Sequence, residues 1–238
     1  MLPEKTWRTD SVLRLLLGVF STWSVGILLA ASLVHFKPPA SNGQTMLLSM
    51  VIITVAFHGA SIFWINSFLK SENISWWEAF GFNQPRRGRA VAWALLAALL
   101  VLPVAWGLQQ LTSQIMTSNH LNPEPQQVVQ EIQKGGFSSF QQIYLALVTL
   151  IAAPVVEEML FRGILYPTIK RAGYPKIALW GTSILFSLTH QNAPAFLSLV
   201  FFAMILTLLY EETGNLIAPI VAHSCFNTAN FVMLLIAQ

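Results

Sequence analysis

The sequence predicts an all-α protein, a polytopic transmembrane helix bundle with about seven spans around a polar cavity. Of its 238 residues, 55% are hydrophobic and only 10% are charged, whereas a soluble domain is about 25% charged. Seven apolar runs have the character of membrane spans. The lysines and arginines fall almost entirely on one side of a seven-span chain. Lipid is therefore the expected solvent for most of the surface.

The predicted spans follow from the apolar runs, because about 20 residues of helix cross the hydrocarbon core. They are Ser11–Phe36, Thr45–Leu69, Arg89–Leu111, Phe140–Ile169, Lys176–His190, Ala193–Tyr210 and Asn215–Ala237. The first run follows two cations, as a signal peptide does, but it exceeds the roughly 7–15 residues of a signal core, so we expect an uncleaved helix. The fifth run is the weakest span, because it is short and polar residues follow it directly.

Three connections between the runs are informative. Lys37 to Asn42 contains Pro38-Pro39 and predicts a short turn. Residues 70–88 combine tryptophans and phenylalanines with arginines, which predicts an amphipathic stretch on the membrane surface. Thr112–Ser139 is the one long polar loop that the sequence predicts.

The positive side chains divide unevenly between the two sides. Ten of the thirteen lysines and arginines fall on one side: Lys5, Arg8, Arg14, Lys70, Arg86, Arg87, Arg89, Lys170, Arg171 and Lys176. Lys37 and Lys134 fall on the other, and Arg162 lies inside the fourth run. Because cytoplasmic loops carry the excess of lysine and arginine, we expect the N-terminus in the cytoplasm and the C-terminus outside.

The fourth apolar run contains three ionisable side chains, Glu157, Glu158 and Arg162. At a rise of about 1.5 Å per residue, Glu157 lies roughly 18 Å along the helix from Lys170, well inside the hydrocarbon. Ionisable residues at that depth are costly unless they face a partner or a wet cavity. A functional role is therefore the first hypothesis for them.

The spacing gives the two carboxylates different tasks. Glu158 and Arg162 are four residues apart, so they share a helix face and can form an ion pair. Glu157 points about 100° away and can serve separately as a general base. A purely structural ion pair is the alternative, but it gives no reason for the second carboxylate.

Two later runs carry histidines that can face the fourth. His190 follows Phe186 by one helical turn, and His223 precedes Asn227 by one turn. Three helices that each carry polar groups at membrane depth indicate one shared site. His58 also lies in an apolar run, but a lone histidine there is more often a satisfied core residue, so no role is assigned to it.

These side chains suffice for hydrolysis of a peptide bond without a covalent intermediate. The predicted catalytic residues are Glu157, His190, His223 and Asn227, supported by Glu158, Arg162 and Phe186. Glu157 and His190 can polarise a water for attack on a carbonyl. His223 and Asn227 can donate hydrogen bonds to the oxyanion that develops.

A divalent metal such as zinc is the alternative means of activating the water. Glu157, His190 and His223 would be its ligands, because two histidines and a carboxylate form an adequate zinc set. The three come from separate helices and no His-Glu-x-x-His helix is present, so we favour a site without a cofactor. The single cysteine, Cys225, excludes a zinc site built on cysteines.

The order of these motifs resembles the CPBP family, the CAAX prenyl proteases and bacteriocin-processing or immunity enzymes that are also called Abi proteins. The similar segments are Glu157-Glu158-x-x-x-Arg162, Phe186-x-x-x-His190, His223-x-x-x-Asn227, Phe161–Leu165 and Thr213–Leu216. The resemblance covers residues 140–232. The first three spans do not contribute to it.

The resemblance implies a CPBP-type intramembrane endopeptidase, of the glutamate type in preference to the metalloprotease type, with a cavity open to the cytosol and the bilayer. Residues 140–238 would form its catalytic core, and residues 1–139 would supply N-terminal spans, an interfacial segment and a polar loop, within one integrated membrane domain. The expected partners are the lipid bilayer and a protein or peptide substrate, CAAX-like and in some cases lipidated, and not nucleic acid. The expected location is the inner (plasma) membrane of a bacterium.

Two other functions are compatible with the same features. A non-catalytic immunity or scaffold protein would keep the fold and bind a partner, although it has little reason to keep every buried polar group. A proton or ion transporter would use the carboxylates and histidines as a relay. Transporters often show inverted repeats, and this sequence shows no internal repeat.

Overall fold

The computed structural model describes residues 7–36, 43–84, 87–124, 127–133 and 136–236. Within these ranges the chain is helical and contains no strand, as the predicted all-α class requires. The turn expected at 37–42 lies outside the described residues, as do four of the cations used for the topology, Lys5, Lys37, Arg86 and Lys134.

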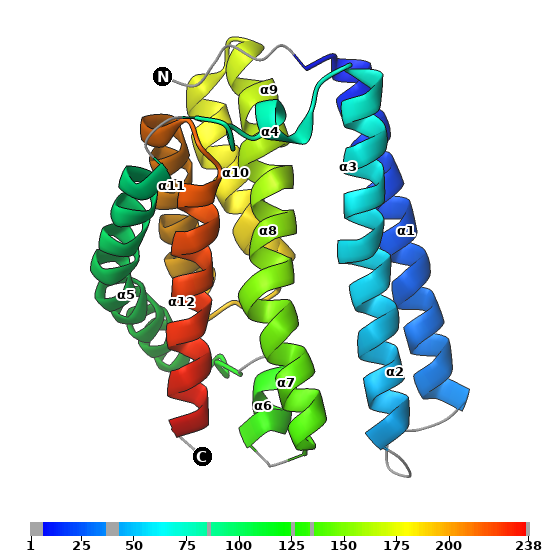
Figure 1. Cartoon of the computed structure of the whole chain (residues 1–238). Helices are drawn as coiled ribbons and strands as arrows, with labels where there is room; N and C mark the ends of the chain where they lie inside the picture. The colour runs from blue at the N-terminus through cyan, green and yellow to red at the C-terminus, as the bar shows by residue number, and fades with distance from the viewer. Residues whose placement is uncertain (1–6, 37–42, 85–86, 125–126, 134–135, 237–238) are drawn as a thin grey trace.

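The chain runs back and forth between the two ends of a helix bundle (Figure 1). Its elements are α1 (Thr9–Phe36), α2 (Gly43–Thr54), η2 (Val55–Gly59), α3 (Ala60–Ser71), α4 (Trp76–Ala79), α5 (Arg87–Ser118), α6 (Gln127–Gln133), α7 (Ser139–Leu147), η3 (Val148–Ala152), α8 (Ala153–Glu158), η4 (Met159–Leu165), α9 (Tyr166–Arg171), α10 (Pro175–Thr189), α11 (Phe196–Thr213) and α12 (Ile217–Ile236). The η elements are π-helical turns inside two otherwise continuous helices. Helix α1 begins and α12 ends at opposite ends of the bundle.

Six helices are long and apolar enough to cross a membrane, counted over the residues described above. They are Thr9–Phe36, Thr45–Ser71, Arg87–Ser118, Ser139–Arg171, Phe196–Thr213 and Ile217–Ile236. The remaining predicted span, Lys176–His190, is the 15-residue helix α10, which extends only about 22 Å at 1.5 Å per residue. It therefore descends part of the bundle depth, and α11 returns from there (Figure 1). Together they form a short pair beside the longer spans.

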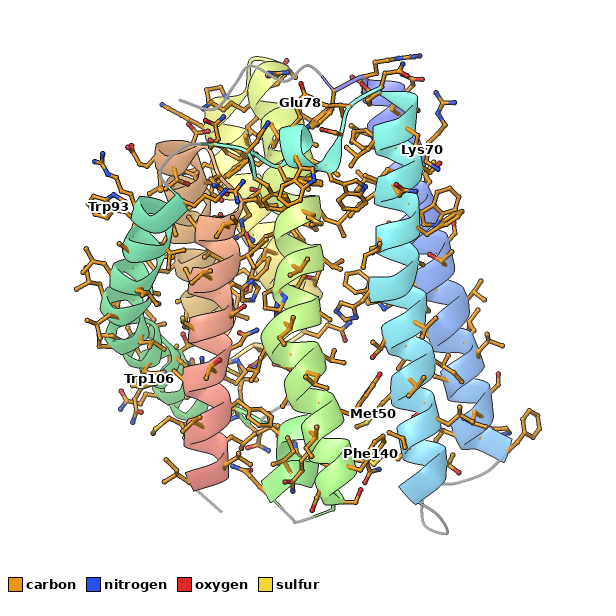
Figure 2. The ribbon with its side chains drawn as sticks, viewed as in Figure 1. Met50, Lys70, Glu78, Trp93, Trp106 and Phe140 are labelled. Carbon is orange, nitrogen blue, oxygen red and sulfur yellow. The ribbon has the colours of Figure 1, made fainter. Side chains whose placement is uncertain are left out.

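The outer surface of the bundle carries large apolar side chains. Leu28, Phe63 and Leu99 are each about two-thirds exposed, which a soluble protein would avoid over such an area. The labelled charges Lys70 and Glu78 lie at the end of the bundle where α1 begins, whereas Met50 and Phe140 lie toward the opposite end (Figure 2). The chain is an integral membrane protein.

The sequence predicted a polar loop over Thr112–Ser139, but part of this segment is helical. The predicted loop was therefore too long. Helix α5 continues to Ser118, and α6 forms a further two turns. The segment after Leu111 contains glutamines, serines and threonines but no glycine or proline before Pro123, so nothing in it stops a helix from continuing past the apolar run.

The segment between α3 and α5 lies partly on the surface, but it also packs into the bundle. Helix α4 is a single turn that Ser75 caps by accepting a hydrogen bond from the backbone N–H of Glu78. Phe80 follows it and is fully buried, and its carbonyl accepts a hydrogen bond of 3.0 Å from the N–H of Leu216. The aromatic side chains that predict a surface segment therefore also fasten this connection to the start of α12.

The bundle has two parts that meet around the fourth span. Helix α5 packs on α11 and α12, and α10 packs on α9 and α11, whereas α1 packs on α2 and α3. Trp7 at the start of α1 links the second part to the first, because its indole N–H donates a 3.2 Å hydrogen bond to the carbonyl of Gly163 in η4. We call α1 together with α2, η2 and α3 the N-terminal hairpin.

Candidate active site

The fourth span carries the two glutamates between two π-helical turns. Helix α8 lies between η3 and η4, with Pro154 in its first turn. In η3 the N–H of Ala153 donates to the carbonyl of Val148, five residues earlier. The next donor in that register would be Pro154, which has no N–H. Such interruptions are frequent at functional sites, and here they lie on either side of α8.

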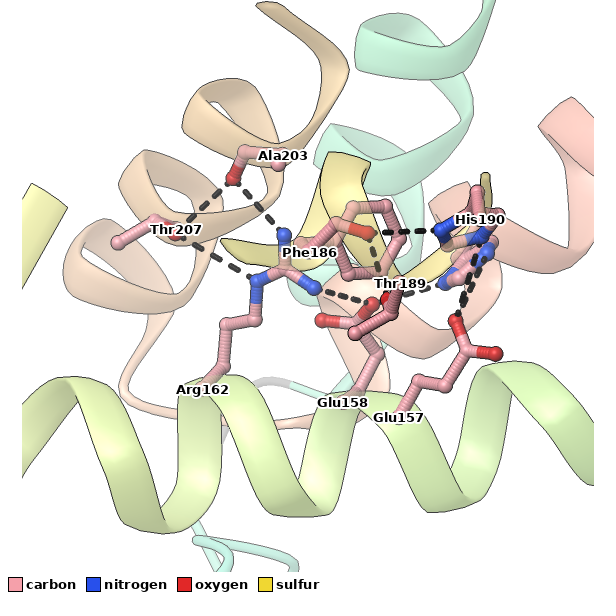
Figure 3. Close-up of polar contacts among 9 residues, drawn as sticks. Glu157, Glu158, Arg162, Phe186, Thr189, His190, Ala203 and Thr207 are labelled. Atoms are coloured by element: carbon pink, nitrogen blue, oxygen red, sulfur yellow. Dashed lines mark hydrogen bonds and ion pairs between the residues drawn. The ribbon is translucent and has the colours of Figure 1, made fainter. Parts of the chain in front are cut away.

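Glu158 and Arg162 form a fully buried ion pair. Their side chains are 0% and 2% exposed, and Arg162 Nη1 lies 2.8 Å from Glu158 Oε1. Arg162 also donates from Nη2 to the carbonyl of Ala203 at 3.0 Å and from Nε to Thr207 Oγ1 at 3.5 Å (Figure 3). The guanidinium lies 4.6 Å from the ring centre of Phe186. The ion pair predicted from the i, i+4 spacing is present. Because the guanidinium is buried, its other N–H groups need acceptors, and α11 supplies them.

His223 of α12 binds the other side of the same carboxylate. Its Nδ1 lies 2.8 Å from Glu158 Oε1, and because a carboxylate oxygen accepts, Nδ1 is the donor. The ring packs edge-on against Phe202 and Phe186, with centroid distances of 5.4 and 5.7 Å. Glu158 therefore fixes both the orientation and the tautomer of His223, so that Nε2 points to Glu157.

His190 is held in the same way by a backbone carbonyl. It is the C-cap residue of α10, and its Nδ1 lies 2.7 Å from the carbonyl oxygen of Phe186, to which it must donate. The Phe186 ring lies 4.6 Å from the imidazole, as the predicted one-turn spacing requires. The neutral ring therefore carries its lone pair on Nε2.

Glu157 lies where the two imidazoles converge. Its Oε2 is 3.9 Å from Nε2 of His190 and 3.9 Å from Nε2 of His223 (Figure 3). Within the described residues this buried oxygen has no hydrogen-bond partner. Two lone-pair nitrogens and a carboxylate oxygen thus surround one point without a donor among them. A water molecule at this point could donate hydrogen bonds to two of the three atoms, Glu157 Oε2 among them.

The same three atoms are also the ligand set for a divalent ion. Two imidazole nitrogens and a carboxylate are common zinc ligands at about 2.0–2.2 Å, and tetrahedral ligands at that distance lie roughly 3.4 Å from each other. The observed 3.9 Å separations would have to contract by a few tenths of an ångström. Across the described part of the chain, no group of three or more His, Cys, Asp or Glu is already arranged as a metal site.

Asn227 lies one turn after His223, but its amide is used by the fourth span. Its Nδ2 donates a 2.9 Å hydrogen bond to the carbonyl of Thr149. In the π register of η3 that carbonyl would pair with residue 154, which is a proline. Asn227 thus supplies the hydrogen bond that Pro154 cannot, and it couples α12 to the turn that leads into Glu157. The sequence could not predict this bond, because it depends on the π register.

A cavity of about 630 Å³ lies between the N-terminal hairpin and the fourth and fifth spans. Glu157 and His190 face it, and most of its wall is apolar, including Leu13, Leu17 and Leu185. These three leucines are also 54%, 64% and 45% exposed, so the cavity is continuous with the lipid-facing exterior. Its wall also contains His58, to which the sequence assigned no role. No sequence signal distinguished that histidine from a core residue.

Fold and site together define an integral membrane protein with a buried carboxylate–imidazole cluster beside an apolar cavity, the arrangement of a candidate intramembrane hydrolase. Residues 139–229 match the family model described as "Type II CAAX prenyl endopeptidase Rce1-like". This part of the chain is similar to that family, which is of the CPBP type, and it contains every residue predicted for the site.

A curated protein is similar to part of the chain. The "Uncharacterized protein YpbD" of Bacillus subtilis (strain 168) is 34% identical over 96 residues, which are 39% of this chain and 46% of the relative. The match thus spans less than half of that relative's length. No solved structure matches the chain.

Proposed function

We propose that the protein is an intramembrane endopeptidase of the CAAX type, which hydrolyses a peptide bond in a membrane-associated substrate. The observation that carries the proposal is the convergence of Glu157 Oε2 with the Nε2 atoms of His190 and His223, each 3.9 Å away. Such a point binds a water molecule between a general base and two oriented imidazoles. The family match over residues 139–229 supports proteolysis in preference to transport or passive binding.

Glu157 acts as the base in this mechanism. It takes a proton from the bound water while the water oxygen bonds to the carbonyl carbon of the scissile peptide, with His190 orienting the water through Nε2. The tetrahedral intermediate collapses as the carbon–nitrogen bond breaks. The proton held by Glu157 passes to the leaving nitrogen. The products are a carboxylate and an amine, and no covalent intermediate with the enzyme is formed.

His223 stabilises the oxyanion of that intermediate. For this role Nε2, which carries the lone pair in the resting ring, must first take a proton from solvent; the resulting imidazolium is paired with Glu158, whose oxygen lies 2.8 Å from Nδ1. Nε2 can then donate to the developing charge. Asn227 has a second amide hydrogen besides the one bonded to Thr149, and that hydrogen is the additional donor. If a divalent ion such as zinc is bound, Glu157, His190 and His223 hold it and it polarises the water and the carbonyl.

The apolar cavity supports a substrate that enters from the membrane. Its wall is hydrocarbon over most of its area, and the two catalytic side chains face its interior. We place the protein in the inner membrane of a bacterium with the start of α1 on the cytoplasmic side, on the basis of the predicted excess of lysine and arginine there. A CAAX-like, lipidated segment at the cytoplasmic surface would reach the cavity without crossing the bilayer.

The test is cleavage of defined peptides by the purified protein in detergent. A panel containing farnesylated and unmodified peptides that end in Cys-aliphatic-aliphatic-X is incubated with wild-type protein and with Glu157→Gln, and products are identified by mass spectrometry. We expect wild-type protein to cleave a panel member and Glu157→Gln to lose at least about 10³-fold in rate. Equal cleavage by both proteins, or no cleavage of any peptide by wild-type protein, would refute the proposal.

A further inference from the structure

His58 lies in a π-helical turn in the middle of the second span. The turn is η2, Val55–Gly59, and it interrupts the helix that continues as α2 before it and α3 after it. Single π turns within α-helices are frequent at functional sites. Here the turn contains the one histidine of the second span.

The imidazole of His58 is poorly satisfied where it lies. Both ring nitrogens are buried, and neither makes a well-formed hydrogen bond to any described residue. The Thr54 carbonyl one turn earlier is the nearby acceptor on its own helix. A buried polar group without a well-formed hydrogen bond destabilises a protein, so an imidazole that has only this weak contact with Thr54 could gain a better partner when a substrate is bound.

The ring also faces the candidate active site across the cavity. His58 lines the cavity together with Glu157 and His190, although it belongs to the N-terminal hairpin and they belong to the fourth and fifth spans. It packs against Phe57, with ring centres 5.0 Å apart, and Phe57 packs against Trp23 at 5.4 Å. These aromatic contacts hold the histidine against the hairpin.

We propose that His58 is a substrate-binding residue, which donates a hydrogen bond to a backbone carbonyl of an extended peptide in the cavity. The proposal rests on the proposed endopeptidase function. A peptide that lies in this cavity leaves water, and its carbonyl groups then require donors from the protein. Among the hairpin residues that line the cavity, only His58 and Trp23 have a nitrogen that can donate, and the others are leucine, isoleucine, valine and phenylalanine. The apolar side chains of the peptide would cover that wall, and His58 would set the register of the scissile bond opposite Glu157.

Binding and turnover are measured for His58→Phe and His58→Gln. Phenylalanine keeps a flat ring of similar size without a donor, and glutamine keeps an amide donor. The probe is a fluorescently labelled, farnesylated peptide that ends in Cys-aliphatic-aliphatic-X, and its affinity is measured by anisotropy with each variant combined with Glu157→Gln. We expect His58→Phe to raise Kd and KM about tenfold with kcat nearly unchanged, which is the effect of one lost hydrogen bond. His58→Gln should recover most of the affinity.

A purely structural role predicts a different pattern. If His58 only fills the core, His58→Phe should bind the peptide with a Kd within twofold of that of the Glu157→Gln parent protein. Alternatively, His58→Phe should unfold at a lower temperature and lose kcat as well as affinity. Either result overturns the proposal. His120→Asn is the matched control, because His120 is exposed after the end of α5 and should leave Kd unchanged. Absence of binding to every protein also contradicts the proposal. Failure of the endopeptidase function itself is recognised separately, by undiminished cleavage in Glu157→Gln alone.

Discussion

Glu157 and Glu158 are adjacent in the chain, yet their carboxylates occupy different surroundings. Glu158 is bonded on both sides, by Arg162 and by His223, each at 2.8 Å. Glu157 is surrounded by groups that lie 3.9 Å away and faces the cavity. Their different surroundings follow from the 100° rotation between successive helical residues, which turns Glu158 to α11 and α12 and Glu157 to the cavity.

Replacing Arg162 by alanine should destabilise the fold as well as abolish cleavage. The substitution leaves Glu158 as a fully buried carboxylate without its ion-pair partner, and loss of one member of such a pair costs about 3–5 kcal/mol. Thermal unfolding in detergent measures the effect. Lys170→Ala is the control, because the Lys170–Glu211 pair is partly exposed and should contribute at most about 1 kcal/mol. A melting temperature equal to that of wild type for Arg162→Ala would contradict the role given to the buried pair.

Asn227→Ala should lower both the cleavage rate and the stability. It removes the proposed oxyanion donor, with an expected loss of about 10²–10³ in kcat. It also leaves the Thr149 carbonyl without the hydrogen bond that Asn227 provides, which costs about 1–3 kcal/mol. Asn230→Ala on the same helix is the control and should leave kcat unchanged. If Asn227→Ala unfolds at the same temperature as wild type, its bond to Thr149 does not help to hold α12 against the fourth span.

The spans are the part of the structure that sequence patterns predict well. In a membrane, a run of about 20 apolar residues must form a helix to satisfy its backbone hydrogen bonds. Six of the seven predicted runs accordingly correspond to helices of spanning length. The π turns at Val55–Gly59 and Met159–Leu165 leave no such signal, because their residues are ordinary helix formers. Spacing therefore predicted that Glu158 meets Arg162, whereas the Asn227–Thr149 bond and the cavity position of His58 depend on helix registers that only coordinates reveal.

Gly163→Ala should disrupt the packing of η4 against the α4 segment. A Cβ at Gly163 would lie 2.6 Å from Phe80 Cε1, and Phe80 is fully buried, so the ring cannot move aside freely. We expect a loss of about 1–3 kcal/mol, measured by thermal unfolding, and a lower cleavage rate because Arg162 precedes this glycine. Gly107→Ala is the matched control, since a Cβ there meets no atom within 4 Å, and it should be neutral or stabilising by up to about 1 kcal/mol. Equal melting temperatures for the two variants would refute this packing contact.

At the scale of the whole molecule, the protein divides into a hairpin and a core with the reaction centre facing the space between them. The core is closed by α5 against α11 and α12, and the hairpin is fastened to it by the Trp7–Gly163 hydrogen bond at one end. The cavity lies farther along the bundle, at the depth of Glu157. In the proposed function, this arrangement would give a membrane substrate lateral access to Glu157 and His190.

The proposed orientation predicts which loops a membrane-impermeant thiol reagent can label. After replacement of the single cysteine by Cys225→Ser, Ser118→Cys at the end of α5 should react in intact cells. Ser71→Cys at the end of α3 should react only after the membrane is opened, because it lies on the side rich in lysine and arginine. The reverse labelling pattern would place the N-terminus outside the cell.

The central claim is that Glu157, His190 and His223 act as one unit around one point, and the most direct test is the peptide cleavage rate of a double variant. Groups that act together are strongly non-additive when they are removed. We therefore predict that Glu157→Gln and His190→Asn are each nearly inactive and that the double variant is no slower than the slower single variant. If the two losses instead multiply, as they do for independent sites, the two side chains do not share one water, and the account of the site is wrong.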